Sequence, residues 1–180
     1  MINWNTIKLD NNIITIYIII YSNNLILLGK ESENGRINKT DANMYSEFYG
    51  DINKNESIPQ AAGRILFEKS MNMIVEQNEF EKLIIDNKIN YKIDNNNIIF
   101  LYKIDYNEFK YIPSYFKKIY DYFFKCTTDN SMNTWNIDSC PIGFMDKSEL
   151  RWFNYRDIIQ EQNKIRKIFF RNMYLVYEFI

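Results

Sequence analysis

The stretch that decides the fold is GDINKNESIPQAAGRILFEKSMNM, residues 50–73. Ser57 is a small hydroxyl residue of the kind that caps helices, and Pro59 follows it where the fixed φ of proline suits the first helical turn. From Gln60 to Met71 the sequence is typical of a helix. The stretch therefore predicts a loop that leads into a capped helix. The loop carries Glu56, and the helix carries Arg64 and Glu68.

The spacing of these residues resembles the Nudix box, the signature of a large family of hydrolases. The family pattern is Gly, five residues, Glu, seven residues, Arg-Glu, an aliphatic residue, any residue, Glu-Glu, any residue, Gly and an aliphatic residue. The positions that match without a gap are Gly50, Glu56, Arg64, Leu66 and Glu68. Family members cleave pyrophosphate bonds in nucleoside diphosphates linked to another group. The residues around the matches look most like Nudix proteins of large DNA viruses and eukaryotes, some of which remove mRNA caps.

Three positions depart from the family pattern. The glutamate expected after the arginine is Ile65, the second of the paired glutamates is Lys69, and the late glycine is Met71. In the family these glutamates hold divalent cations, and Mg²⁺ prefers several oxygen ligands in octahedral geometry. The resemblance thus implies Mg²⁺ or Mn²⁺ as cofactor, and the departures predict that this chain holds it weakly or has lost it.

The resemblance implies an α/β fold, a Nudix-type α/β/α sandwich with a mixed β-sheet, followed by a C-terminal helical extension. Ile13–Tyr21 is a nearly unbroken run of β-branched and aromatic residues, which predicts a strand buried on both faces. Asn23-Asn24 predicts a turn, with 25–29 returning as the hairpin partner. No repeat or linker divides the chain, so we expect one Nudix-like domain over residues 1–180.

The remaining elements are predicted from apolar periodicity and turn residues. A short strand over 44–49 should enter Gly50. Further strands are expected at 91–93, 98–104 and 150–153, and helices at 78–86, 111–125 and from 154 to the end, with a break near Asn172.

The family pattern carries catalytic and metal roles onto four residues. Glu56, Arg64 and Glu68 are the expected catalytic residues, and Glu56 and Glu68 are the expected metal ligands, with Glu149 as an outside carboxylate. A structural alternative exists for each box residue. Glu56 would be a favourable charge at a helix N-terminus, and Glu68 would pair with Arg64 four residues away, a contact worth about 0.2–0.5 kcal/mol.

Three residues are candidates for substrate binding: Tyr49, Lys69 and Trp152. An ammonium at Lys69 could bind phosphate directly, although a solvated helix lysine is the simpler interpretation. Tyr49 and Trp152, with the neighbouring aromatic residues of 45–48, could stack on a base. The alternative is that these aromatic rings belong to the core.

Composition excludes several classes of function. The 180 residues include no histidine, which excludes Ser-His-Asp and Cys-His catalysis and His-containing metal sites. Cys126 and Cys140 are too few for a disulfide framework, and a net charge of −1 gives no sign of a nucleic-acid coat. The run at 13–21 is too short to cross a membrane, and no signal peptide is evident. We expect a cytoplasmic protein, in the host cytoplasm if the chain is viral.

The sequence supports three functional hypotheses. The first in rank is a Nudix-fold pseudoenzyme that binds a nucleotide or capped RNA with weak or no hydrolase activity. The second is an active, metal-dependent pyrophosphohydrolase or decapping enzyme. The third is a structural or interaction protein that uses only the fold and has a protein partner.

Overall fold

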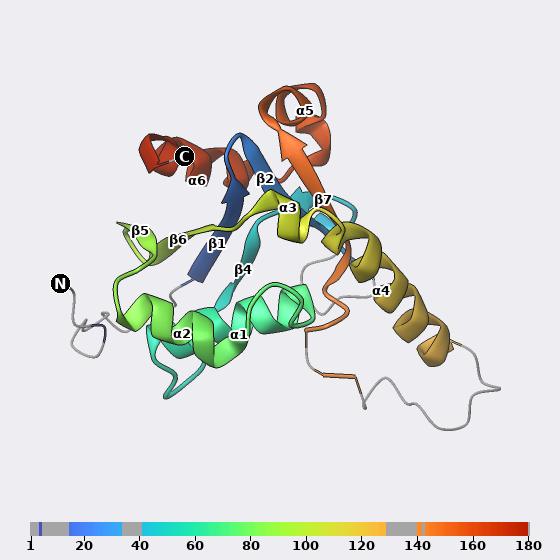
Figure 1. Ribbon diagram of the computed structural model, residues 1–180, viewed down its shortest axis with the longest axis horizontal. Coiled ribbons are helices and arrows are strands. Elements are labelled where there is room, and N and C mark those ends of the chain that lie inside the picture. Colours follow the sequence, from blue (N-terminus) through green and yellow to red (C-terminus); the bar gives the residue numbers. More distant parts are fainter. Residues whose placement is uncertain (1–3, 5–14, 34–40, 129–139, 142, 180) are drawn as a thin grey trace.

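The computed structural model describes residues 4, 15–33, 41–128, 140, 141 and 143–179, and its sheet lies between two layers of helices (Figure 1). The strands are β1 (Thr15–Ser22), β2 (Leu25–Glu31), β3 (Tyr45–Ser46), β4 (Phe48–Asp51), β5 (Asn90–Asp94), β6 (Asn97–Lys103) and β7 (Lys147–Asn154). The helices are α1 (Ile58–Ser70), α2 (Gln77–Ile85), α3 (Tyr106–Phe109), α4 (Ile112–Thr128), α5 (Tyr155–Gln160) and α6 (Lys167–Val176), with 3₁₀ turns at Gln162–Lys164 and Tyr177–Phe179.

The sheet is mixed, as predicted. β1 pairs in parallel with β6 and antiparallel with β2 and β4, while β7 and β3 both pair with β2. Ile16, Ile18, Ile19 and Ile20 of β1 are fully buried, because helices cover both faces of this strand. Ile13 and Ile14 of the predicted strand lie outside the described residues.

Helix α1 begins where the sequence predicts. The Ser57 side chain accepts the backbone N–H of Gln60, whose side chain accepts the backbone N–H of Ser57, so the two residues form a capping box. The helix ends at Ser70, and its C-cap residue Met71 has a φ of 53°, in the left-handed region favoured at helix ends. Met71 stands at the late glycine of the family pattern, and it adopts the conformation for which glycine is usually chosen.

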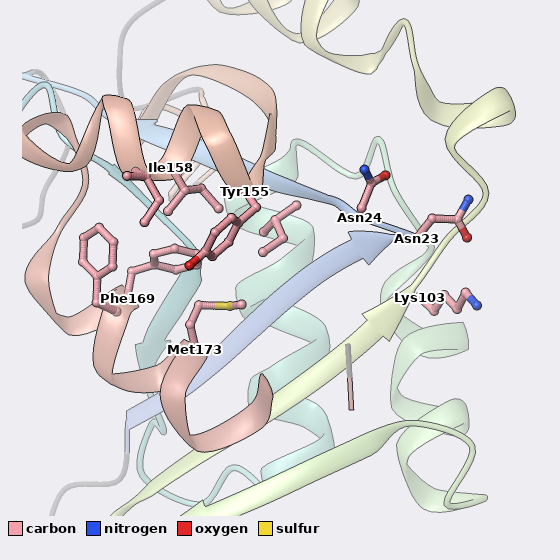
Figure 2. A pocket seen from close by; sticks show the side chains of 10 residues that line it. Asn23, Asn24, Lys103, Tyr155, Ile158, Phe169 and Met173 are labelled. Carbon is pink, nitrogen blue, oxygen red and sulfur yellow. The ribbon is translucent and has the colours of Figure 1, made fainter. Parts of the chain in front are cut away.

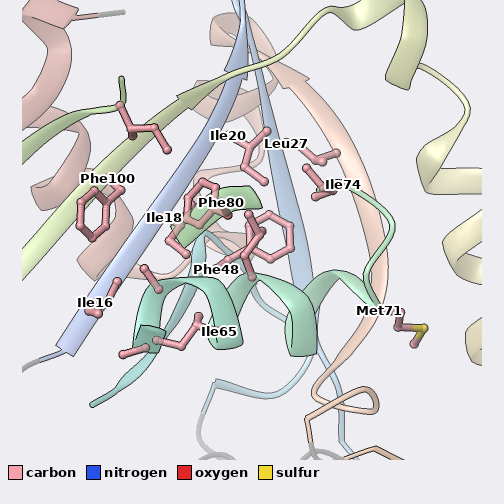
Figure 3. Close-up of a cluster of buried hydrophobic side chains, with 14 of the residues drawn as sticks. Ile16, Ile18, Ile20, Leu27, Phe48, Ile65, Met71, Ile74, Phe80 and Phe100 are labelled. Carbon is pink, nitrogen blue, oxygen red and sulfur yellow. The ribbon is translucent and has the colours of Figure 1, made fainter. Parts of the chain in front are cut away.

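Two apolar clusters lie on opposite faces of the sheet. The first packs α1, α2 and α4 against side chains such as Ile18, Phe48 and Phe100, and Figure 3 shows Ile65 of α1 pointing into it. The second packs α5 and α6 against side chains such as Ile19, Leu28 and Phe153. The α/β/α arrangement and the C-terminal helices therefore match the predicted fold class.

Several element boundaries differ from the prediction. The expected strand at 44–49 is two strands, β3 and β4, because Glu47 interrupts the pairing between them. The C-terminal helices break at 161–166, where Ile165 forms a bridge to Tyr45 beside the sheet, and the chain is helical at Asn172. No helix within the described residues is long and apolar enough to cross a membrane.

Candidate active site

Arg64 joins the loop of the box to its helix. Its Nε and Nη2 atoms donate to the two carboxylate oxygens of Glu56 at 2.7 and 2.8 Å, and Nη2 also donates to the backbone carbonyl of Asp51 at 2.8 Å. A bidentate guanidinium–carboxylate pair fixes orientation as well as distance. The loop that carries Glu56 is thereby held against the middle of α1.

Both carboxylate oxygens of Glu56 accept hydrogen bonds. The pKa of Glu56 depends on these bonds and on the burial of the side chain. Partial burial raises the pKa of Glu56, but the hydrogen bonds from Arg64 and from the backbone N–H of Asn53 outweigh it. The pKa of Glu56 therefore lies below its ordinary value. Glu56 is therefore ionised near neutral pH, and protein groups already supply hydrogen bonds to both of its oxygens.

Glu68 lies one turn beyond Arg64 and is covered by another segment of the chain. Its Oε2 atom is 3.4 Å from Nη1 of Arg64, which leaves a weaker contact than that of Glu56. Gly143 approaches so closely that a Cβ atom there would lie 2.9 Å from Oε2 of Glu68. The φ of Gly143 is +85°, so glycine is needed both for the backbone and for this approach. Burial raises the pKa of Glu68 against the opposing charges of Arg64 and Lys69.

Lys69 is not a solvated helix lysine, and that interpretation is wrong. Its side chain is only 5% exposed, and its Nζ atom forms a salt bridge with Asp146, which is also buried. Next to this pair Phe67 packs on Phe144, with ring centroids 5.4 Å apart. The segment 143–146 therefore lies over the end of α1. The ammonium of Lys69 is buried and paired with Asp146, so it is not presented to a phosphate group in solution.

The remaining candidate ligands do not gather at the box. Ile65 is fully buried and packs against Gly50, where an added Cβ would lie 3.0 Å from its side chain. Glu149 of β7 accepts a hydrogen bond from Tyr45, whose ring belongs to the cluster under α5 and α6. Glu149 thus lies on the face of the sheet opposite the box.

The donors present do not fit a divalent cation at the box. Glu56 is satisfied by Arg64, Glu68 lies under Gly143, and a buried ammonium stands beside them at Lys69. Mg²⁺ and Mn²⁺ need several free oxygen ligands. Within the ranges that the structure describes, no three Asp, Glu, Cys or His residues are grouped as metal ligands would be.

Tyr49 and Trp152 do not share a surface. Tyr49 is 8% exposed, stacks on Tyr17 with ring centroids 6.0 Å apart, and belongs to the cluster under α5 and α6. Trp152 packs on the opposite cluster, meets Tyr106 edge-on, and donates from Nε1 to the carbonyl of Phe109 at 3.4 Å. The sheet lies between the two rings, so they cannot clamp one base.

A second charged centre, which the sequence analysis missed, surrounds Lys147. Its side chain has no exposed surface, and Nζ lies 2.5 Å from Glu31, 2.6 Å from the hydroxyl of Ser46 and 3.1 Å from the carbonyl of Glu47. The aliphatic part crosses Gly29, where a Cβ would lie 2.8 Å from the lysine Cδ. Burial lowers the pKa of Lys147, and the neighbouring charge of Glu31 opposes that shift.

The polar cluster continues from Glu47 toward α6. Glu47 is fully buried, and its Oε1 accepts a hydrogen bond from Asn172 at 2.6 Å. The guanidinium of Arg166 lies 4.3 Å from the ring centroid of Tyr49 and pairs with Asp41 at 2.9 Å. The sequence carried a signal only at Glu47, a charged residue between the aromatic side chains of Tyr45 and Phe48; Glu31 and Lys147 stand in strands that hold other charged residues.

The sequence and the structure were compared with protein families, curated proteins and solved structures, and only the solved structures gave matches. No protein-family model matches the sequence, and no curated protein matches it significantly. Among solved structures, the chain is similar to a bifunctional NMN adenylyltransferase/ADP ribose pyrophosphatase from Francisella tularensis, complexed with AMP and a manganese ion. The identity is 14% and the TM-score 0.55, over 97% of this chain and 44% of that one. This chain thus spans less than half the length of the Francisella protein.

Two Nudix hydrolases are also similar, at lower TM-scores. A Nudix hydrolase from Nitrosomonas europaea shares 13% identity over 94% of this chain and 72% of its own, with a TM-score of 0.44. A Nudix-family hydrolase from Clostridium perfringens shares 12% identity over 94% of this chain and 99% of its own, with a TM-score of 0.43. The TM-score of 0.55 to the Francisella structure shows a shared α/β/α fold, as the box predicts, and an identity of 14% establishes the fold alone.

Proposed function

We propose that this protein is a Nudix-fold pseudoenzyme, a binding module for a nucleotide or capped RNA with little or no hydrolase activity. The observation that carries the proposal is the internal neutralisation of the box. Arg64 engages both oxygens of Glu56, and Lys69 is buried against Asp146 beside Glu68. A cation at Glu56 would have to displace the Arg64 guanidinium, and the Asp146 carboxylate near Glu68 is already paired with Lys69.

The loss of metal chemistry leaves the loop and helix of the box intact. Pyrophosphate hydrolysis of the Nudix type needs metal ions to neutralise charge that develops on the phosphate oxygens. Here Arg64 holds the same loop and helix together through Glu56 and the carbonyl of Asp51. The nucleotide part of the proposal is supported by the likeness to the Francisella structure, which contains AMP.

The test measures binding and hydrolysis separately. AMP, ADP-ribose and a cap dinucleotide are titrated by calorimetry in EDTA and again with Mn²⁺, and released products are quantified by chromatography. We expect at least one ligand to bind in EDTA, with affinity unchanged by Mn²⁺ and no product. Mn²⁺-dependent hydrolysis that Glu68→Gln abolishes would overturn the proposal.

A protein-interaction role is the second candidate, because α4 carries an exposed aromatic stripe. Tyr115, Ile119 and Tyr122 of α4, with Tyr111 just before it, are 37–59% exposed and recur at helical spacing. Apolar side chains in that pattern suit a partner protein. Failure of every nucleotide to bind would contradict the first proposal and favour this one, and sedimentation of wild type against Tyr115→Ser would then test it.

A further inference from the structure

A cavity lies on the far side of the sheet from the box, between α5, α6 and the turn that joins β1 to β2. Its volume is about 610 Å³, within the range of pockets that bind small molecules. Figure 2 shows that the apolar side chains gather at one end and the polar ones at the other. The lining of the cavity is therefore amphipathic, with an apolar end and a polar end.

The apolar end is built by the two C-terminal helices. Ile26, Ile158 and Phe169 are buried at its base, and the partly buried Phe170 and Met173 pack beside them. Tyr155 is 76% exposed and Ile159 is 50% exposed at the mouth. The break at 161–166 turns the chain between α5 and α6, and the bridge from Ile165 to Tyr45 fixes that turn to the sheet. These apolar side chains form one wall of the cavity, and no side chain of the described residues fills the space beside them.

The polar end is built by the ends of two strands. Asn23 and Asn24 form the β1–β2 turn, with Asn23 at a φ of 51°, and Lys103 is the last residue of β6. Lys103 is the one charged side chain among the cavity-lining residues of the described chain, and it makes no ion pair there. The nearby carboxylate of Asp105 accepts the backbone N–H of Asn107 and so caps α3.

We propose that this cavity binds an amphipathic small molecule, with an apolar or planar aromatic body and one anionic group. The body would lie between Tyr155, Phe169 and Met173, where each apolar atom removed from water contributes to affinity. The carboxylate or phosphate would face Lys103, with the Asn23 and Asn24 amides as further donors. The site is separate from the box, so it does not depend on nucleotide binding there.

The experiment uses naphthylacetate and naphthyl phosphate as anionic probes and naphthaleneethanol as their neutral counterpart. Binding is measured by calorimetry and located by the amide chemical shifts of the labelled protein. We expect one site for an anionic probe with a dissociation constant at or below about 1 mM. Shifts should move at Asn23, Asn24 and Met173 and stay unchanged along α1.

Two variants distinguish the contribution of the Lys103 charge to binding from that of the apolar wall. Lys103→Gln should weaken the anionic probes by roughly three- to five-fold and leave the alcohol unchanged. Ile159→Glu should weaken both kinds of probe by about ten-fold or more, because it places a carboxylate in an apolar wall. Ile159 is half exposed, so this change leaves the core packed.

Matched controls come from α2, on the opposite face of the sheet. Lys82→Gln and Ile85→Glu change an exposed lysine and an exposed isoleucine in the same way, and neither should alter binding. Absence of binding by the wild type, or equal loss in the α2 controls, would overturn the proposal. Equal effects of Lys103→Gln on anion and alcohol would overturn the role of the charge.

Discussion

Arg64 and Lys147 both hold carboxylates, but their surroundings differ. Arg64 pairs with Glu56 and Glu68 within one loop and one helix, and its side chain is 21% exposed. Lys147 of β7 has no exposed surface and gathers groups from β2 and β3 around its ammonium. The first centre shapes a local motif, whereas the second ties distant strands together inside a medium where an unpaired charge is costly.

This difference indicates where the fold now gets its stability near the box. Carboxylates at both centres are compensated by cations of the chain itself, Arg64 at the box and Lys147 in the interior. Variants that remove one partner at a time should therefore have effects that grow with burial.

Lys147→Met should produce the largest effect. It leaves Glu31 buried without its cation, and breaking a buried pair costs about 3–5 kcal/mol of unfolding free energy. Urea unfolding followed by circular dichroism measures the loss. Lys82→Met, on the surface of α2, is the control and should change stability by less than about 0.5 kcal/mol.

The second charge can be removed as well. Lys147→Met combined with Glu31→Gln should regain more than half of the loss, because the uncompensated carboxylate is gone. A cost of Lys147→Met no greater than that of Lys82→Met would contradict the comparison between the two centres.

Lys69→Met should have the next largest effect, about 2–3 kcal/mol, because Asp146 would lose the Lys69 ammonium at a site that is also buried. A double-mutant cycle with Asp146→Asn isolates the pair, and we expect a coupling energy above about 1 kcal/mol. Mn²⁺ titration of each variant adds a second readout. Additive losses without coupling would mean that the Lys69–Asp146 pair does not help to hold the segment 143–146 in place.

The contrast between the two centres also explains what the sequence could predict. The capping box, the helix and the Arg64–Glu56 contact depend on residues within about one turn or loop of each other, so spacing reveals them. The burial of Lys69 depends on Asp146, which is 77 residues away in sequence. No local pattern encodes that partner, and a lysine on a helix is ordinarily solvated.

The same reasoning applies to Glu149, Tyr49 and Trp152. Each was placed near the box because of its residue type and order in the chain. Alternation along β7 puts Glu149 and Trp152 on opposite faces, and the face that meets α1 is fixed by pairing with β2. Register across strands decides which side chains meet, and a single strand does not determine it.

Glu56→Gln should have a smaller, pH-dependent effect. The pKa of Glu56 is lowered in the folded state, so its stabilising contribution is present above the unfolded value near 4.3 and is lost as the pH falls through the folded pKa. At pH 7 the loss should be about 1 kcal/mol, reduced from that of a buried pair by partial exposure. Thermal unfolding at pH 7 and pH 3 measures it.

The matched variant at the box is Glu68→Gln. Its pKa is raised by burial, so removing that charge should cost little or nothing at pH 7. A larger loss for Glu68→Gln than for Glu56→Gln would place the main carboxylate contact of Arg64 at Glu68.

The smallest effect, and the one of opposite sign, is expected for Glu47→Gln. Burial raises the pKa of Glu47, and the hydrogen bond from Asn172 only partly offsets that shift. A folded pKa above the unfolded value means that the native state binds more protons between the two, so stability falls as the pH rises through that window. Glutamine keeps the oxygen that accepts from Asn172 and has no charge to bury. Glu47→Gln should therefore match the wild type near pH 4 and gain a little stability relative to it at pH 8, as followed by thermal unfolding.

Glu79→Gln, an exposed change on α2, should show no such pH-dependent gain. A loss of stability at pH 8 would mean that Glu47 is held as a carboxylate by Lys147 and Arg166, which would join Glu47 to the buried centre as a charged member.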